Sequence, residues 1–146
     1  MTILILYTLI LSLALAILEI QIEGPNGWAE KLPCWKKKKG IIPEKLIGAP
    51  LTSYHLALMG FLIIIAHFPF VFIDWNISVE LQIIAVLLLI SVIEDFFWFV
   101  LNPKFPYKKF REKEIWWHTH WIGPFPAYYW INAFAAIIML YLSLCP

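Results

Sequence analysis

The residues best suited to do chemistry are two adjacent acids inside an apolar stretch, Glu94 and Asp95. A carboxylate at such a depth in a bilayer costs roughly 2.5–3.5 kcal/mol on insertion scales, and a neighbouring like charge adds repulsion. Acids persist there when they face a cavity, are paired or bind a cation. The structural alternative is that they only hold helices together through hydrogen bonds to Ser91, Tyr128 or Asn132.

Further carboxylates and imidazoles fall at the same end of the apolar segments. Glu19 and Glu23 close the first segment, and His55 opens the second. His118 and His120 come just before the fourth. We therefore expect these groups to gather in one layer. His67 lies far from that layer, which favours a structural role for it.

Carboxylates and imidazoles are ligands of divalent first-row metals, and imidazole suits zinc and iron. The first hypothesis is a site for zinc or iron that acts on or binds a lipophilic substrate. Its predicted ligands are Glu19, Glu23, His55, Glu94, Asp95, His118 and His120. Its predicted catalytic residues are Glu94, Asp95 and His118. The chain lacks the Glu-x-x-His motif of carboxylate-bridged dimetal bundles, which favours a single metal.

Two alternatives use the same residues without a metal. A buried carboxylate beside a histidine can form an acid–base pair that isomerises or hydrolyses a lipid-like substrate. No Gly-x-Ser-x-Gly motif or phosphate-binding loop supports covalent catalysis. The other alternative is a non-enzymatic accessory subunit, or a protein that binds a lipid or a pigment.

The tryptophans are unevenly placed along the predicted fold. Seven of the eight fall at the end that carries the acids and histidines, whereas an interfacial belt marks both membrane surfaces. This asymmetry favours an aromatic-walled pocket. The predicted pocket residues are Trp98, Trp117, Trp121, Tyr128, Tyr129 and Asn132.

Four apolar runs must position these groups. The chain has 146 residues, 62% hydrophobic and 14% charged, whereas a soluble domain has about 25% charged residues. This composition argues against a soluble enzyme or a nucleic-acid partner. The sequence predicts one all-α integral membrane domain over residues 1–146, a bundle of four transmembrane helices with two cytoplasmic loops. The expected helices are residues 3–22, 53–73, 79–101 and 127–144, and the loops are 24–52 and 102–125.

Small and polar residues form stripes that predict which helix faces meet. In the first helix they are Thr8, Ser12, Ala16, Glu19 and Glu23, spaced by three or four residues. Comparable stripes follow from Ser91 to Asn102 and from Tyr128 to Ser143. Such faces pack together in lipid. Ser78 is the expected N-cap of the third helix. The stretches 22–29 and 94–103 resemble motifs, although no activity can be attached to them.

All 11 Lys and Arg residues lie in the two long loops. The positive-inside bias predicts cytoplasmic loops and outward termini, in the cytoplasmic membrane of a prokaryote. It also places Cys34 and Cys145 on opposite sides, so we expect no disulfide between them. Expected partners are membrane lipids, with another membrane subunit or a homo-oligomer as further possibilities. The basic residues expected to contact lipid headgroups are Lys36, Lys37, Lys38, Lys39, Lys108, Lys109 and Arg111.

Overall fold

The computed structural model describes residues 2–37 and 50–144 and confirms an all-α fold. Its long helices are α1 (Thr2–Glu23), α3 (Ser53–Ala66), α4 (Ile77–Leu101) and α6 (Ala127–Ser143). Its short helices are η1 (Phe68–Val71) and α5 (Tyr107–Arg111). Two antiparallel pairs of two-residue strands lie in the loops. They join β1 (Lys36–Lys37) to β2 (Leu51–Thr52) and β3 (Trp121–Ile122) to β4 (Phe125–Pro126).

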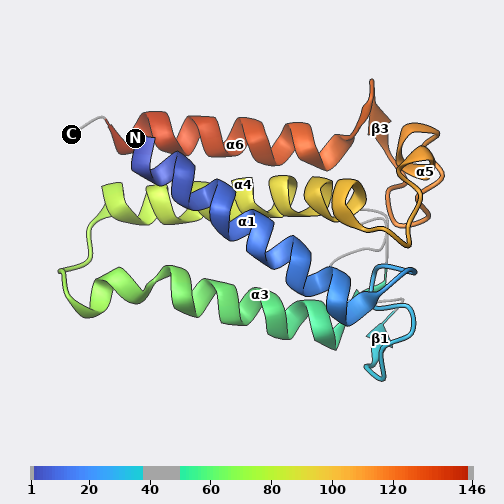
Figure 1. The fold of residues 1–146 in the computed structure, drawn as a ribbon. Helices are drawn as coiled ribbons and strands as arrows, with labels where there is room; N and C mark the ends of the chain where they lie inside the picture. The colour runs from blue at the N-terminus through green and yellow to red at the C-terminus, as the bar shows by residue number, and fades with distance from the viewer. Residues whose placement is uncertain (1, 38–49, 145–146) are drawn as a thin grey trace.

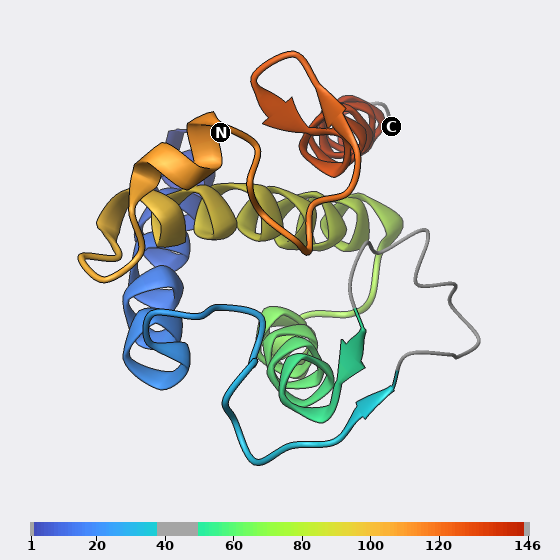
Figure 2. The ribbon, with the colours of Figure 1, turned by 90° about the vertical axis from the view of Figure 1, so that its right-hand side faces the viewer.

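Helix α4 is the centre of the fold (Figures 1 and 2). α6 runs alongside it and α1 crosses it, and these two helices supply most of its contacts. α3 touches α4 only sparsely and has no buried residue. The loops that carry β1, α5 and β3 lie at one end of the helices, whereas α1 begins and α6 ends at the other (Figure 1).

The predicted stripe of α1 is its buried face. Thr8, Ser12, Ala16, Glu19 and Glu23 are all buried. The hydroxyl of Thr8 donates to the carbonyl of Leu4, and that of Ser12 donates to the carbonyl of Thr8. The Thr8 and Ser12 hydroxyls therefore need no polar partner outside α1. The small size of these two side chains and of Ala16 lets α1 approach α4 closely.

Polar contacts join α4 to α6 at two levels. Asn132 Nδ2 donates to Ser91 Oγ over 3.0 Å, near the middle of both helices. At the far end, Ser78 Oγ donates to the carbonyl of Ser143 over 2.6 Å. Ser78 is therefore not the N-cap of α4. Asn76 caps the helix instead, because its side chain accepts from the Val79 N–H.

The predicted helix 53–73 is shorter in the structure. α3 ends at Ala66, and the 3-10 helix η1 follows His67. Pro69 explains the break, because proline has no N–H to continue the α-helical pattern. His67 pairs with Glu80 over 3.1 Å, which ties the α3–α4 connection to the start of α4.

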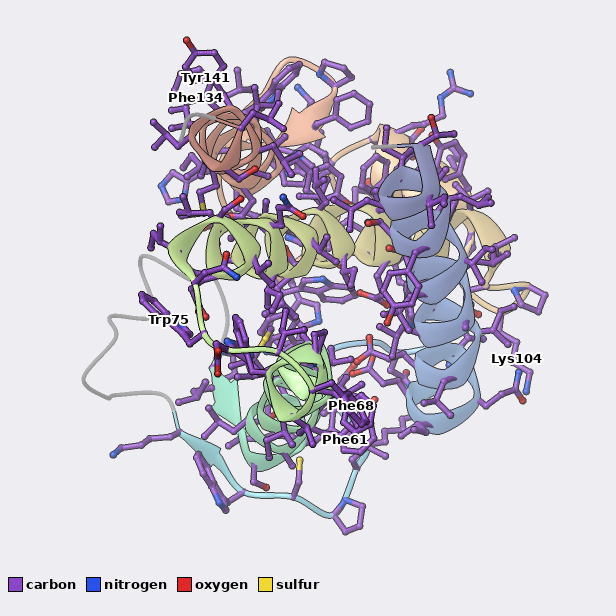
Figure 3. The ribbon with its side chains drawn as sticks, turned by 90° about the vertical axis from the view of Figure 1, so that its left-hand side faces the viewer. Phe61, Phe68, Trp75, Lys104, Phe134 and Tyr141 are labelled. Carbon is purple, nitrogen blue, oxygen red and sulfur yellow. The ribbon has the colours of Figure 1, made fainter. Side chains whose placement is uncertain are left out.

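Many large apolar side chains of α1, α3 and α6 are exposed. Phe134, for example, extends from α6 away from the other helices (Figure 3). Among the described residues, α1 and α4 are long and apolar enough to cross a bilayer, with 22 and 25 residues. α3 and α6 are apolar but shorter.

A compact aromatic core closes the loop end of the fold. Trp98 and Phe99 of α4 pack there against Phe105, Phe110 and Trp117 from the loop between α4 and α6. All five side chains are buried. This core explains part of the uneven tryptophan distribution and fixes the loop that carries His118.

Candidate functional site

A cavity of about 330 Å³ lies among α1, α3 and α4. This volume falls at the lower end of the range for small-molecule pockets. α6 adds Tyr128 to its wall, and the loops add Trp28, Trp117 and His118. The ionisable groups that line it are Glu19, Glu23, His55, Glu94, Asp95 and His118.

The cavity has a polar end and an apolar end. Along α4 its lining runs from Leu87 to Trp98, which corresponds to about 16 Å of helix. All the ionisable groups lie toward the loop end of the helices. The aliphatic part of the wall consists of Leu15, Leu58, Met59, Leu62, Leu87 and Ile90. This polarity matches a molecule with one polar group and an apolar body.

A pair of carboxyl groups joins α1 to α4 at the polar end. Glu19 and Glu94 are hydrogen-bonded to each other, and Tyr54 of α3 also donates to Glu19 over 3.2 Å. A hydrogen bond between two carboxyl groups requires a proton on one of them. The pair therefore supplies a carboxylic acid that can donate a proton inside the cavity.

Asp95 and His118 form a second pair. His118 Nε2 lies 3.1 Å from Asp95 Oδ2, and the Tyr129 hydroxyl donates to the same oxygen over 2.6 Å. Tyr128 also donates to Asp95. The His118 side chain is almost fully buried, so the carboxylate holds the imidazole in one orientation. An imidazole oriented by a carboxylate is a suitable general base.

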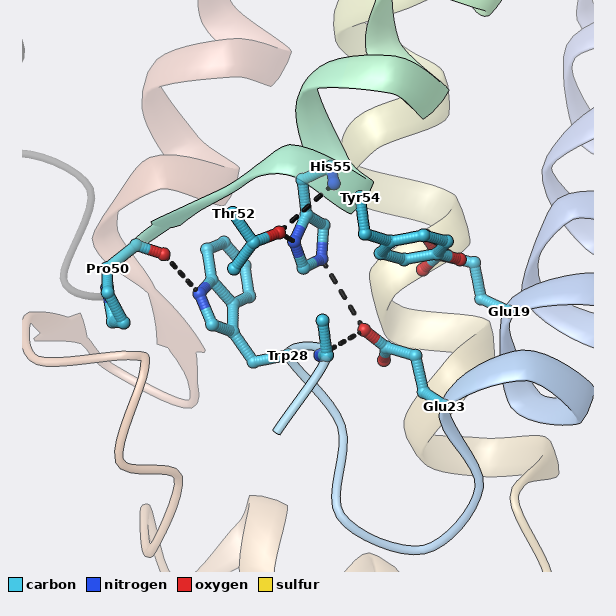
Figure 4. A network of polar contacts seen from close by, with 8 residues as sticks. Glu19, Glu23, Trp28, Pro50, Thr52, Tyr54 and His55 are labelled. Carbon is cyan, nitrogen blue, oxygen red and sulfur yellow. Dashed lines mark hydrogen bonds and ion pairs between the residues drawn. The ribbon is translucent and has the colours of Figure 1, made fainter. Parts of the chain in front are cut away.

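Glu23 and His55 form the third pair (Figure 4). His55 Nε2 lies 3.5 Å from Glu23 Oε1, and His55 Nδ1 lies 2.6 Å from the Thr52 hydroxyl. Thr52 also accepts from the His55 backbone N–H as the N-cap of α3. Because the Thr52 oxygen already accepts from the backbone N–H, its hydroxyl proton can be donated to His55 Nδ1. Nδ1 is then the acceptor nitrogen of the imidazole, and the ring proton is on Nε2, which faces Glu23.

A left-handed turn after α1 builds the wall beside this third pair. Gly27, Trp28 and Ala29 have φ values of +65°, +46° and +51°. The turn stacks Trp28 on His55 at 4.4 Å between ring centroids, and Trp28 Nε1 donates to the Pro50 carbonyl (Figure 4). It also directs the Ala29 N–H to Glu23. Two non-glycine residues in this conformation indicate backbone strain, which is often held at functional sites.

The two motif-like stretches meet in the fold. Asn102, just after α4, is buried, and its Nδ2 donates to the carbonyl of Gly24 over 2.9 Å. Gly27 packs against Trp98 and Trp117, so closely that an added Cβ would lie 2.6 Å from a Trp117 ring carbon. The segment after α1 is therefore positioned by the end of α4 and by the loop before α6.

The structure brings six of the seven predicted metal ligands to one cavity. The seventh, His120, is exposed, and its Nδ1 contacts the Thr119 hydroxyl. Of the predicted pocket residues, Trp98, Trp117 and Tyr128 line the cavity. Tyr129 supports Asp95 from outside it, Asn132 bonds Ser91, and Trp121 packs on the aromatic core.

The basic residues lie apart from the cavity. Those that the structure describes are exposed, namely Lys36, Lys37, Lys108, Lys109 and Arg111. Lys38, Lys39 and Cys145 lie outside the described residues, so their predictions have no structural counterpart.

Sequence reasoning missed Trp28, Thr52 and Tyr54 as site residues. Trp28 follows the glycine and proline residues that mark the end of α1, five residues after Glu23. This closeness in sequence to a predicted site residue could have indicated Trp28. Thr52 and Tyr54 flank the start of α3 next to His55, and nothing in their spacing distinguishes them from ordinary capping and interfacial residues.

The ligands are arranged as pairs rather than as a metal-binding set. Within residues 2–37 and 50–144, no group of three or more His, Cys, Asp and Glu side chains is placed to hold a metal ion. The predicted seven-residue ligand set is therefore not formed in this part of the chain. Each imidazole that lines the cavity instead faces one carboxylate.

Fold and site together describe an all-α protein. Its described residues include two helices long and apolar enough to cross a membrane, and ionisable side chains line a cavity between the helices. Comparison with known proteins adds no family: no protein-family model, curated protein or solved structure matches the chain.

Proposed function

We propose that the chain is an integral membrane protein whose four long helices all lie in the bilayer, with the loop end on the cytoplasmic side. The exposed apolar side chains on α1, α3 and α6 support this proposal, because contiguous apolar surface of this extent is unusual on a soluble monomer. The exposed Lys and Arg residues on the loops that carry β1 and α5, which lie at one end of the helices (Figure 1), support the orientation. A reporter fused after α6 should be found outside the cell, and a cytoplasmic reporter would contradict this topology.

We further propose that the cavity binds an amphiphilic, lipid-like molecule and that the protein transfers protons on its polar group. The cavity itself carries this proposal, since its ionisable groups lie at one end and aliphatic side chains at the other. In this function the Asp95–His118 pair is the base and the Glu19–Glu94 pair is the acid. Both pairs line the same cavity, as acid–base catalysis on one substrate requires.

The simplest reaction of this kind is an isomerisation. His118 accepts a proton from one position of the substrate, and the protonated carboxyl group of the Glu19–Glu94 pair returns one at another position. The substrate keeps its composition, and the protein's net proton count is unchanged. Exchange of protons between the two pairs through the cavity then restores the starting state.

The experiment is to extract the protein purified in mild detergent and identify bound amphiphiles by mass spectrometry. Leu62→Trp places a large ring in the cavity, whereas Leu56→Trp alters an exposed position of the same helix. We expect the amphiphile with the wild type and Leu56→Trp and its loss with Leu62→Trp. Equal recovery from both variants, or no amphiphile in any sample, would overturn the proposal.

Turnover of the recovered amphiphile tests the catalytic part. His118→Gln should abolish it, while His120→Gln, at an exposed histidine outside the cavity, should leave it unchanged. Activity that survives His118→Gln in a folded sample would remove the assigned base. A stoichiometric metal that disappears in Glu94→Ala would instead restore the metal-dependent form of the hypothesis. A stable protein partner combined with an empty cavity would favour an accessory subunit.

A further inference from the structure

Two buried polar atoms of the cavity wall have no partner among the described residues. They are the indole Nε1 of Trp98 and the carboxyl Oε1 of Glu94. Trp98 is only 3% exposed, and both residues line the cavity. They are four residues apart on α4, so their side chains lie next to each other on one face of the helix. Leaving buried polar atoms unpaired is costly, which indicates that a ligand group completes them.

The chemistry of the two atoms restricts that group. An indole N–H only donates, so the ligand must present an acceptor to Trp98. Glu94 also lines the cavity, and its Oε1 accepts a hydrogen bond whenever this carboxyl group is ionised. A hydroxyl group meets both requirements with a single oxygen, because it accepts from the indole and donates to the carboxyl group. An ammonium group cannot accept from Trp98, and an ether cannot donate to Glu94.

The charges around the cavity restrict the ligand further. Four carboxyl groups and two imidazoles line it, and no Lys or Arg of the described part of the chain does. A carboxylate or phosphate headgroup would therefore be buried beside acids without a fixed cation, which is strongly unfavourable. The described lysines and the arginine are exposed on the loops instead.

We propose that the amphiphile is a lipophilic alcohol, an uncharged molecule with one hydroxyl group. The hydroxyl lies between Trp98 Nε1 and Glu94 Oε1, and the apolar body extends along Leu58, Leu62 and Leu87. This inference rests on the proposed function, because it names the class of molecule that the same cavity binds.

The test uses four probes with the same chain, namely 1-decanol, decylamine, decanoate and decyl phosphate. Binding is measured by native mass spectrometry of the whole chain in amphipol. We expect 1-decanol to bind at least about tenfold more tightly than the other three, as the loss of one hydrogen bond in a buried site implies. Decyl methyl ether, which accepts but does not donate, should fall between the alcohol and the anions.

Two variants link the preference to the indole N–H. Trp98→Phe removes the donor but keeps an aromatic ring, and we expect the preference for 1-decanol over decyl methyl ether to persist while both bind about tenfold more weakly. Trp116→Phe, at an exposed tryptophan outside the cavity, should change neither affinity. Glu94→Leu should remove the preference for the alcohol over the ether.

The outcomes separate the two proposals. Equal binding of 1-decanol and decyl phosphate, or unchanged alcohol affinity in folded Trp98→Phe, would overturn the assignment of the alcohol and leave the amphiphile cavity standing. Binding of all probes that survives Leu62→Trp would show that they bind elsewhere and would overturn both proposals. Failure of every probe to bind the wild type would do the same.

Discussion

Substitution of Gly27 by alanine should destabilise the protein through two separable effects. Gly27 has a φ of +65°, and an alanine in this conformation costs about 1–2 kcal/mol. The added Cβ would also lie 2.6 Å and 3.0 Å from two ring carbons of Trp117 and 3.0 Å from one of Trp98. Overpacking of this kind costs about 1–3 kcal/mol, since both rings are buried and must move. The expected loss in free energy of unfolding is therefore about 2–5 kcal/mol.

Gly24 provides a matched control for the backbone effect. Its φ is +68°, close to that of Gly27, but an added Cβ would meet nothing within 4 Å. Gly24→Ala should therefore cost only the backbone part, about 1–2 kcal/mol. The difference between the two variants isolates the packing of the turn against the tryptophans.

The assay is denaturant unfolding in detergent micelles, followed by far-UV circular dichroism. Tryptophan fluorescence and near-UV dichroism should change in folded Gly27→Ala, because Trp98 and Trp117 are displaced, and should stay unchanged in Gly24→Ala. Amphiphile binding should weaken with Gly27→Ala alone, since both rings line the cavity. Equal destabilisation by the two substitutions would refute the argument that this glycine is required by close packing.

Two further predictions concern hydrogen bonds that support the cavity from outside. Tyr129→Phe removes a hydroxyl that donates to Asp95 over 2.6 Å. It should lower the free energy of unfolding, measured by denaturation, by about 1.5–3 kcal/mol. It should also slow turnover of the recovered amphiphile, because Asp95 orients His118. No change in either quantity would remove Tyr129 as a support of the base. Asn102→Ala removes the bond to the Gly24 carbonyl and the acceptor of the Lys104 N–H, so a loss of about 1–3 kcal/mol is expected on the same denaturation curve. A melting curve identical to the wild type would show that this link does not hold the two segments together.

Much of the helical architecture follows from periodicity in the sequence. The buried face of α1 was predicted because Thr8, Ser12 and Ala16 recur at helical spacing, and this spacing depends only on the geometry of one helix. The end of α3 at Ala66 was not predicted, because the apolar run continues through Pro69. Hydropathy measures only how apolar the residues are and takes no account of the backbone N–H that proline lacks. The N-cap of α4 was assigned two residues late, because Asn76 and Ser78 are both good caps and only the contact of Ser78 with α6 separates them.

Position along the apolar segments predicts which side chains lie near the loop end of the helices. Glu19 and Glu94 have depths that follow from their positions on α1 and α4, because each residue adds a fixed rise to a helix. His118 was expected at the same end because it comes just before the fourth apolar segment. The tertiary structure alone decided which groups pair. The placement of α3 beside α1 brings His55 to Glu23, and the path of the loop before α6 turns His120 away to the surface.

The physical reason is that pairing depends on contacts between segments distant in sequence. Trp98 and Trp117 pack against the left-handed turn at Gly27, and Asn102 donates to the Gly24 carbonyl just before it. None of these contacts is local in sequence. Helix faces are set by the chain's own geometry, whereas the cavity between them is set by how four helices and two loops pack together.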